Sequence, residues 1–245
     1  MKDAAKMETK VALVTGANRG IGFETARELG EMGIRVVLGS RDPEQGKKAA
    51  SLLAARGIAA EALRLDVTLP ADHRLAHAYL AERYGRLDIL VNNAAILVRD
   101  SSSVAQSEEL RRVFETNFFG TVELTQALLP LIRKAPSGRI VNVSSIVGSL
   151  TLHSDPGSRI YDSKLFSYDA SKTALNAFTV HLAYELRGTK IKVNSADPGW
   201  VKTEMGGEDA LLEVSEGGKS SARLATLPED GPSGGFFRLY EAFPW

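Results

Sequence analysis

Short hydrophobic runs alternate with segments of helical periodicity along this chain. The strand-like runs cover residues 10–16, 34–40, 60–67, 86–94, 138–145, 190–199 and 234–240. Helical patterns occupy residues 23–33, 43–57, 71–84, 107–134 and 168–187. This alternation predicts a doubly wound α/β fold, in which a parallel sheet of about seven strands carries helices on both faces. Neither a repeat nor a linker divides the sequence, so we expect a single domain spanning residues 1–245.

Ligands of such sheets bind beyond the carboxyl ends of the strands. The first of these ends runs into "TGANRGIG", which has glycines at positions 16, 20 and 22. Gly16 permits a tight turn, Gly20 lets the backbone approach a pyrophosphate, and Gly22 allows close packing of the helix. The start of that helix favours an anion. We therefore expect a Rossmann-type dinucleotide-binding loop at this edge.

Composition excludes several classes of function. The 30 Lys and Arg residues balance 30 Asp and Glu residues, which argues against nucleic acid or an anionic membrane as a partner. The chain has no cysteine, so disulfides, thiolate nucleophiles and cysteine-bound metals are excluded. The polar start "MKDAAKMETK" lacks the apolar core of a signal peptide, and no run has the length of a membrane span. We expect a cytoplasmic protein.

Further motifs occur in the order found in a known family. "TGANRGIG" resembles the cofactor loop of the short-chain dehydrogenases/reductases. The family's other landmarks are similar to "LDVT" (65–68), "NNAA" (92–95), "TNFFGT" (116–121), "IVNVSS" (140–145), "YDASK" (168–172) and "DPGWVKT" (197–203). The resemblance covers almost the full chain, and it implies a nicotinamide-dependent oxidoreductase.

Charge at the end of the second strand indicates which nicotinamide cofactor binds. An acidic residue there would accept hydrogen bonds from the ribose diol of NAD, whereas this chain has Ser40 and Arg41. Arg19 in the glycine loop can approach from the other side, and two guanidinium groups suit a 2′-phosphate. Asp42 lies one position too late to accept the diol. We therefore expect NADPH/NADP+ as the cofactor.

The resemblance implies roles for further residues near the cofactor. Asp66 would contact the adenine amino group, Asn92 and Ala94 would shape the loop beneath the cofactor, and Ala95 stands where the family usually has glycine. Pro198 and Gly199 would turn the backbone under the nicotinamide. The full set of expected cofactor-binding residues is Gly16, Asn18, Arg19, Gly20, Ile21, Gly22, Ser40, Arg41, Asp66, Val67, Asn93, Ala94, Tyr168, Lys172, Pro198, Gly199, Val201 and Thr203.

Two Tyr–Lys pairs lie close together, in "YDSK" and "YDASK". A nearby ammonium group and the cationic oxidised nicotinamide would lower the pKa of a tyrosine, so that its phenol can move a proton at neutral pH. Tyr168 and Lys172 are four residues apart, share a helix face and match the family's Y-x-x-x-K signature. Tyr161 and Lys164 follow Pro156 and Gly157, which indicate a loop. The sequence favours Tyr168 as the general acid.

The resemblance completes the expected catalytic set with Ser145 and Asn117. Ser145 would orient the carbonyl oxygen of the substrate, and Ser144 is the weaker alternative. Asn117 would hold a water that connects Lys172 to solvent, unless it only bends its helix. The expected reaction is the NADPH-dependent reduction of ketones and aldehydes. An alcohol or sterol dehydrogenase acting oxidatively and a non-catalytic NADPH sensor are the alternatives.

We expect no metal site. His73 and His77 are four residues apart, but "HRLAH" lacks a glutamate and has a polar helical pattern. His153 fits a surface position in the loop before Tyr168, with a place beside the substrate as the alternative, and His181 fits a helix face.

The 22 residues between Ser145 and Tyr168 exceed the usual length in the shorter family members. This insert, residues 146–167, resembles the carbonyl reductase and menthone reductase-like branch, where it can cover a helical surface used for association. We therefore expect a monomer, with a dimer as the alternative. Leu152, Tyr161, Trp200 and Met205 are candidates for an apolar pocket that takes a small carbonyl substrate.

Overall fold

The computed structural model describes residues 9–245. Most of the polar start, which lacks the apolar core of a signal peptide, therefore lies outside the described residues. All strands of the described chain form one sheet with the order β3-β2-β1-β4-β5-β6-β7-β8. The strands are β1 (Val11–Thr15), β2 (Arg35–Ser40), β3 (Ala60–Arg64), β4 (Ile89–Asn92), β5 (Arg139–Val143), β6 (Lys192–Ala196), β7 (Phe236–Arg238) and β8 (Glu241–Ala242). The first seven run parallel, and β8 pairs antiparallel with β7. The expected doubly wound sheet is confirmed, with eight strands instead of about seven, because the last residues fold back on β7.

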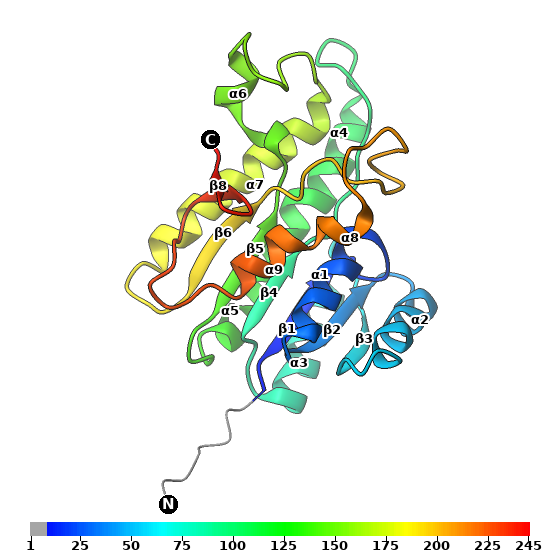
Figure 1. The fold of residues 1–245 in the computed structure, drawn as a ribbon, viewed down its shortest axis with the longest axis vertical. Coiled ribbons are helices and arrows are strands. Elements are labelled where there is room, and N and C mark those ends of the chain that lie inside the picture. The colour runs from blue at the N-terminus through cyan, green and yellow to red at the C-terminus, as the bar shows by residue number, and fades with distance from the viewer. Residues whose placement is uncertain (1–8) are drawn as a thin grey trace, which may run out of the picture.

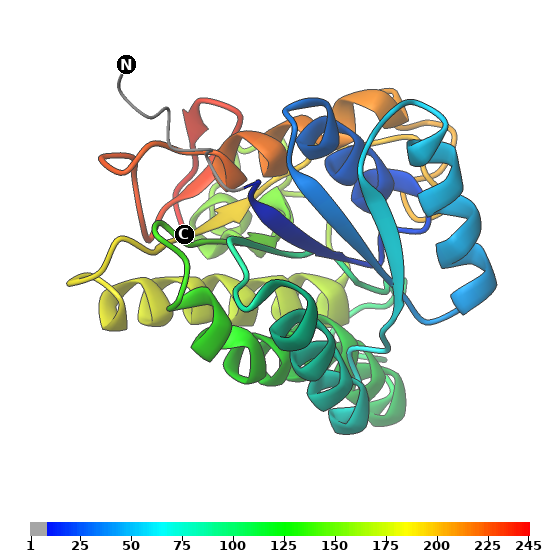
Figure 2. The same ribbon diagram turned by 90° about the horizontal axis from the view of Figure 1, so that it is seen from below.

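Helices cover both faces of the sheet (Figures 1 and 2). One face carries α1 (Gly20–Glu31), α2 (Pro43–Ala54), α8 (Val214–Gly217) and α9 (Lys219–Ala225). The other carries α3 (Pro70–Tyr84), α4 (Ser107–Phe114), α5 (Gly120–Ile132) and α7 (Phe166–Glu185). Each face encloses an apolar cluster, built around Leu29 and Leu53 on the first and Leu80 and Leu128 on the second. The central strands β1 and β5 are buried along their whole length, which explains why most of their residues are apolar.

Two departures from the sequence expectations affect the candidate site. The long helical region at 107–134 is broken by a π-helical segment, η1 (Glu115–Phe119), between α4 and α5. The region ahead of Tyr161 is not all loop, because it contains a 3₁₀ turn, η2 (Ile146–Gly148), and a short helix, α6 (Leu150–Ser154). The last residues reach α6, where the Thr151 amide donates to the carbonyl oxygen of Trp245 at 3.0 Å (Figure 1). The insert is thus an ordered part of the carboxyl edge.

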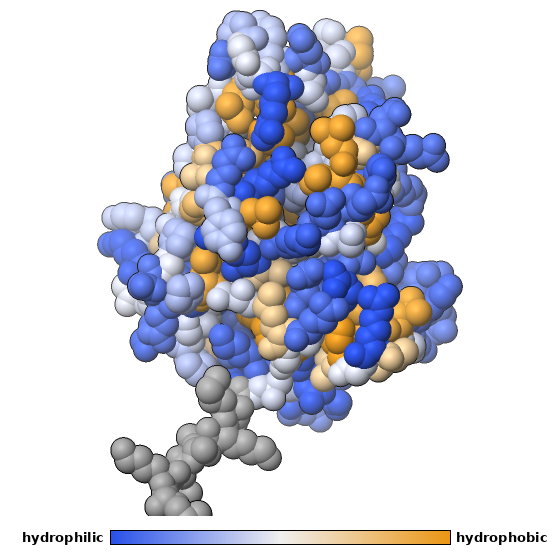
Figure 3. All heavy atoms as spheres, viewed as in Figure 1, coloured by the Kyte–Doolittle hydropathy of each residue, from blue (hydrophilic) through white to orange (hydrophobic). Residues whose placement is uncertain are grey.

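On the face seen in Figure 3, hydrophobic side chains are scattered among hydrophilic ones. Among residues 9–245, no helix is both long and apolar enough to span a membrane.

Candidate active site

The glycine loop follows β1 in a conformation that only small residues fit. Gly16 has φ +62° and Gly20 has φ +58°, in the left-handed region that favours glycine. A Cβ on Gly16 would lie 3.0 Å from the Cα of Ala94, and one on Gly22 would lie 2.6 Å from the carbonyl oxygen of Gly16. Side chains at these two positions would therefore push the loop away from the sheet.

Asn93 holds this loop in place. Its side-chain nitrogen donates to the carbonyl oxygens of Thr15 at 2.8 Å and Gly16 at 3.2 Å. The Thr15 hydroxyl accepts from the backbone amides of Asn93 and Ala94, both at 2.9 Å. The loop thus gains its shape from the residues after β4, as expected for Ala94, and Asn93 takes the part that was expected of Asn92.

The expectation that Asn92 shapes the loop is wrong, because this side chain points into the core. Its nitrogen donates to Asn142 Oδ1 at 2.8 Å, and the nitrogen of Asn142 donates to the Thr179 hydroxyl at 2.9 Å. Thr179 in turn lies 2.9 Å from the hydroxyl of Ser195. This buried polar chain joins β4, β5 and β6 to α7, and so fixes the helix that carries Tyr168.

The start of α1 fits the pyrophosphate of a dinucleotide. Arg19 precedes the helix without capping it through its side chain, so the first amide groups stay open to an anion. A Cβ built on Gly20 would be in ordinary van der Waals contact with Thr203 Cγ2 at 3.5 Å, so the backbone of the loop is not crowded at this position. The residues present therefore fit the cofactor that the sequence indicates.

The end of β2 presents a cation rather than an acceptor for a diol. Arg41 is exposed there, whereas Ser40 is buried and its hydroxyl donates to the carbonyl oxygen of Asp42 at 2.8 Å. The Asp42 carboxylate caps α2 by accepting from the amides of Glu44 at 2.9 Å and Gln45 at 3.1 Å. Asp42 is thus engaged in capping, while the guanidinium of Arg41 is open to solvent.

Arg19 forms an ion pair with Glu204, and their side chains are 70% and 74% exposed. The pair connects the glycine loop to the segment after Thr203. Pro198, Gly199 and Val201 precede this segment, and Gly199 has φ +80°, as a turn at this position requires.

Asp66 and Val67 follow β3 at the same edge. The carboxylate of Asp66 accepts from the amide of Thr68 at 3.0 Å and from its hydroxyl at 2.8 Å. The carbonyl oxygen of Val67 lies 2.8 Å from Nε2 of His73, which is buried. His73 lies in a helix, as its pattern indicates, but its ring is buried and holds the loop after β3.

Tyr168 and Lys172 lie in the first two turns of α7. The Lys172 side chain is buried, its nitrogen donates to the carbonyl oxygen of Val143 at 2.8 Å, and it lies 5.5 Å from the centre of the Tyr168 ring. Ser145 hydrogen-bonds to Tyr168 through its side chain. Tyr161 lies outside this group, 40% exposed, with the nitrogen of Lys164 5.0 Å from its ring centre. Ser145, Tyr168 and Lys172 therefore meet at the end of β5, and Tyr161 does not join them.

No hydrogen bond joins the Ser144 hydroxyl to this group within the described residues. Ser144 is buried, and its hydroxyl has no hydrogen-bond partner within residues 9–245. Ser145 is half-buried, and its hydroxyl accepts from the amide of Val147 at 3.4 Å. The geometry thus favours Ser145 over Ser144.

The pKa values of the Tyr–Lys pair move in opposite directions. Burial, followed by the charges of Asp197 and Asp169, raises the pKa of Tyr168, and the hydrogen bond with Ser145 opposes this rise. Burial lowers the pKa of Lys172 to about 7. The sequence argument expected a lowered pKa for Tyr168, so the direction in the protein alone is opposite. Without the cofactor charge, desolvation outweighs the neighbouring amine.

Asn117 lies in the π-helical segment, a feature often found at functional sites. Its side chain accepts from the amide of Ile96 at 2.8 Å, and donates to the Ile96 carbonyl oxygen at 2.9 Å and to the Ser171 hydroxyl at 3.0 Å. The side chain therefore links the loop after β4 to α7, close to Lys172. Its part in a proton relay stays a prediction.

Asp197 is a site residue that the sequence argument missed. Its Oδ1 accepts from the amide of Ile146 at 2.9 Å, beside Ser145, and its Oδ2 is buried without a hydrogen-bond partner in the described chain. Burial raises its pKa, and the charges of Arg238 and Arg159 oppose this rise. The signal was present in "DPG", where a carboxylate follows an otherwise uncharged strand end.

The candidate substrate residues lie at the rim of this edge. Leu152 is half-buried in α6, while Trp200 is 51% exposed and its ring nitrogen donates to the carbonyl oxygen of Gly206 at 2.8 Å. Met205 is half-buried in the same loop as Trp200. The rim is therefore formed by the insert and by the loop after β6.

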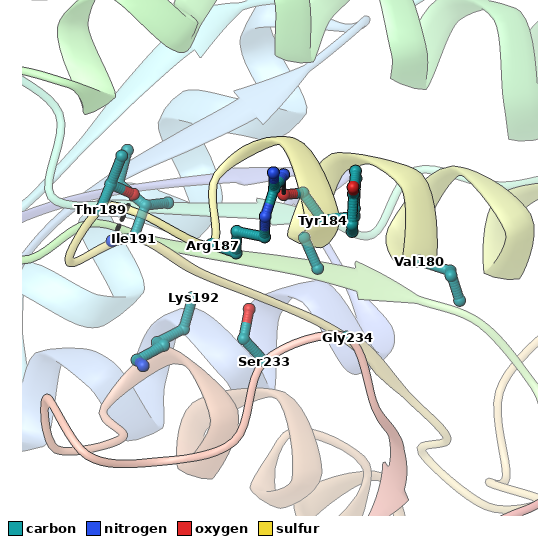
Figure 4. A pocket seen from close by; sticks show the side chains of 9 residues that line it. Val180, Tyr184, Arg187, Thr189, Ile191, Lys192, Ser233 and Gly234 are labelled. Atoms are coloured by element: carbon teal, nitrogen blue, oxygen red, sulfur yellow. Dashed lines mark hydrogen bonds between the residues drawn. The ribbon is translucent and has the colours of Figure 1, made fainter.

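One surface hollow of about 330 Å³ lies away from these residues, between the end of α7 and the start of β6 (Figure 4). Arg187 and Tyr184 border it, with the guanidinium 3.9 Å from the ring centre. Since the start of β6 is at the opposite edge of the sheet from Tyr168, this hollow is separate from the candidate site. Within residues 9–245, no group of three or more His, Asp or Glu side chains could hold a metal ion.

Comparisons with known proteins agree with this geometry. Residues 10–211 match the family model described as short chain dehydrogenase. Carbonyl reductase [NADPH] 1 of Mus musculus is 34% identical over 96% of this chain and 98% of its own length, and (+)-neomenthol dehydrogenase of Arabidopsis thaliana is 34% identical over 95% and 97%. The crystal structure of NADPH-bound carbonyl reductase from chicken fatty liver superposes with a TM-score of 0.85, with 32% identity over 97% of this chain and 99% of that one. The chain therefore belongs to the short chain dehydrogenase family, and within it is similar to the carbonyl reductases.

Proposed function

We propose that this protein reduces ketones and aldehydes to alcohols with NADPH. The observation that carries the proposal is the meeting of Ser145, Tyr168 and Lys172 at the end of β5, on the same sheet edge as the glycine loop. A protein that only senses NADPH would need the loop and Arg41, and would not need this group.

The choice of NADPH rests on the charges around the end of β2. Arg41 is exposed there, and Arg19 lies in the neighbouring glycine loop, so two guanidinium groups suit a 2′-phosphate. Asp42 is engaged in capping α2 and does not offer an acceptor to a ribose diol. The similarity to carbonyl reductases named for NADPH supports the same choice.

When bound, NADPH supplies the hydride that adds to the carbonyl carbon. Ser145 and Tyr168 hold the carbonyl oxygen, and the phenol of Tyr168 gives its proton to that oxygen as negative charge develops. The phenol of Tyr168 is protonated at neutral pH even at its ordinary pKa of about 10, and in the protein alone burial raises that pKa further. Lys172 lies beside the phenol, and we infer that it returns the proton through water near Asn117.

The test follows the loss of NADPH absorbance with a panel of activated ketones and aldehydes, and repeats it with NADH. We expect turnover of several substrates and a preference for NADPH. Binding of NADPH without turnover across the panel would instead support the sensor, and faster turnover of alcohols with NADP+ at neutral pH would support the oxidative dehydrogenase.

Other expectations stand as parts of this proposal. We expect Leu152, Tyr161, Trp200 and Met205 to contact the substrate. We expect a single domain over residues 1–245 that works as a cytoplasmic monomer. Light scattering after size-exclusion chromatography measures the mass of the particle and so tests the assembly state. A hollow of about 420 Å³ over α4 and η1, lined in part by Leu110, Phe114 and Phe119, is the apolar surface to examine if a dimer is found.

A further inference from the structure

One histidine of the insert contacts the turn that follows the candidate catalytic serine. Ser149 caps α6 by accepting from the amide of Leu152 at 3.2 Å, and the helix then presents His153 to the turn after Ser145. Nε2 of His153 lies 2.8 Å from the carbonyl oxygen of Val147. The His153 side chain is only 11% exposed, so the expectation of a surface histidine is wrong.

Lys164 determines which ring nitrogen of His153 carries the proton. Its side-chain nitrogen lies 3.0 Å from Nδ1 of His153 and 3.1 Å from the carbonyl oxygen of the same residue. An ammonium group has only donors, so Nδ1 must be the acceptor and Nε2 the protonated atom that donates to Val147. Burial and the charge of Lys164 lower the pKa of His153, while the hydrogen bond to Val147 raises it. The contacts therefore select one neutral tautomer.

Asp169, in α7, is the third residue in contact with the ring of His153, after Val147 and Lys164. Its Oδ2 accepts from the amide of Leu165 at 2.8 Å and lies 3.4 Å from Nε2 of His153. Burial raises the pKa of Asp169 to about 6, and Asp100, which binds the amide of Ser167, adds to the rise. Asp169 directly follows Tyr168, so His153 bridges the turn after Ser145 and the residue after Tyr168.

We propose that His153 is a positioning residue, which ties α6 to the Val147 carbonyl and to Asp169 and so sets how Ser145 faces Tyr168. The inference rests on the proposed reduction at these two residues. Lys164, from the Tyr–Lys pair that lacks the catalytic geometry, gains a role here as the residue that orients the ring.

The first test compares His153→Leu with His153→Gln, whose amide nitrogen can reach the position of Nε2. We expect kcat/KM for ketone reduction to fall about tenfold in the leucine variant, as the loss of one hydrogen bond of about 1.4 kcal/mol predicts. The glutamine variant should recover most of the activity. In a fluorescence titration, both variants should bind NADPH with the affinity of the wild type. His181→Leu, at an exposed position of α7, is the matched control and should stay within twofold.

The second test uses Lys164→Met, an exposed substitution that spares the buried ring. Because Lys164 lowers the pKa of His153, its removal should raise that pKa and move the acid limb of kcat/KM to higher pH. Lys190→Met, which removes an exposed partner of Glu229, should leave the limb in place. Lys164 also lowers the pKa of Asp169, so the shift belongs to His153 only if it is absent when Lys164→Met is made in the His153→Gln variant, in which Asp169 still titrates.

An active wild type with unchanged kcat/KM in His153→Leu would overturn the inference, as would equal losses in the leucine and glutamine variants or an acid limb unmoved by Lys164→Met. An inactive wild type that binds NADPH would instead contradict the proposed function.

Discussion

The side-chain nitrogen of Lys172 donates a hydrogen bond to the carbonyl oxygen of Val143 at 2.8 Å. Val143 ends β5, two residues before Ser145, so this bond joins the helix of Tyr168 to the strand that leads to the serine. Burial of the amine lowers its pKa to about 7 from an ordinary 10.5. The bond thus fixes the site at the cost of holding a cation away from water.

The buried lysine should make the stability of the cofactor-free protein depend on pH. Between pH 7 and 10.5 the unfolded state binds more protons at Lys172 than the folded state, so the free energy of unfolding rises with pH over this interval. Each unit between the two pKa values corresponds to about 1.4 kcal/mol. We therefore expect Lys172→Met to be more stable than the wild type by a few kcal/mol at pH 7 and below, with the gain vanishing toward pH 10.5.

Urea unfolding across pH 6–10 measures this gain, and Lys190→Met serves as an exposed control. A constant difference between Lys172→Met and the wild type at every pH would show that the amine is not desolvated.

The two tyrosines should respond differently to the loss of a hydroxyl. Tyr168→Phe should lower kcat for ketone reduction by about 10²–10⁴-fold, the usual range for a general acid, while NADPH binds with unchanged affinity. Tyr161→Phe should change kcat less than threefold and affect mainly KM, because Tyr161 lies on the exposed insert. Steady-state kinetics with one ketone and fluorescence titration of NADPH separate these effects. Near-normal kcat in Tyr168→Phe would refute its assignment as the acid.

Local patterns were sufficient to predict the sheet, the glycine loop and the position of Tyr168 and Lys172 on one helix. The spacing of four residues between Tyr168 and Lys172 depends only on the helix, and the helix was clear from its apolar pattern. The same reasoning could not distinguish Asn92 from Asn93, since alternation along a strand places one in the core and one at the edge only when the strand end is known.

Contacts between distant segments could not be predicted from the sequence. Asp197 reaches Ile146 across 51 positions, and His153 gains its role from a turn, a lysine and a helix that meet only in the folded chain. The raised pKa of Tyr168 has the same origin, because it depends on burial and on the carboxylate of Asp197. A motif indicates which residues react, whereas their surroundings set their pKa values.

Arg41 should determine the cofactor preference. Arg41→Asp removes a cation that suits the 2′-phosphate and adds an acceptor for the ribose diol, so we expect the ratio of kcat/KM for NADPH over NADH to fall by at least tenfold. Arg56→Asp, an exposed charge change after α2, is the control and should leave the ratio unchanged. An unchanged ratio in Arg41→Asp would contradict the assignment.

Glu204 should compete with the cofactor for Arg19. The two side chains form an exposed ion pair, which is worth at most about 1 kcal/mol. Glu204→Gln should therefore tighten NADPH binding by up to about fivefold and leave NADH binding unchanged, because only NADPH carries the 2′-phosphate. Fluorescence titration with both cofactors at low ionic strength measures the effect, and equal tightening for the two would contradict this explanation.

Asp197→Asn should separate the charge of this residue from its hydrogen bond. The amide oxygen can still accept from the amide of Ile146, but the negative charge that raises the pKa of Tyr168 is lost. Reduction needs the protonated phenol, so a lower pKa of Tyr168 should move the alkaline limb of kcat/KM to lower pH.

The alanine variant completes this experiment. Asp197→Ala removes both the charge and the acceptor. It should therefore shift the alkaline limb of kcat/KM in the same direction. It should also raise KM, because the turn that starts at Ile146 loses its anchor and Ser145 directly precedes that turn. Asp230→Asn, at an exposed position, should change neither. If the limb stays at the wild-type pH in both Asp197 variants, then the carboxylate does not act on Tyr168, and burial with the charge of Asp169 accounts for the raised pKa.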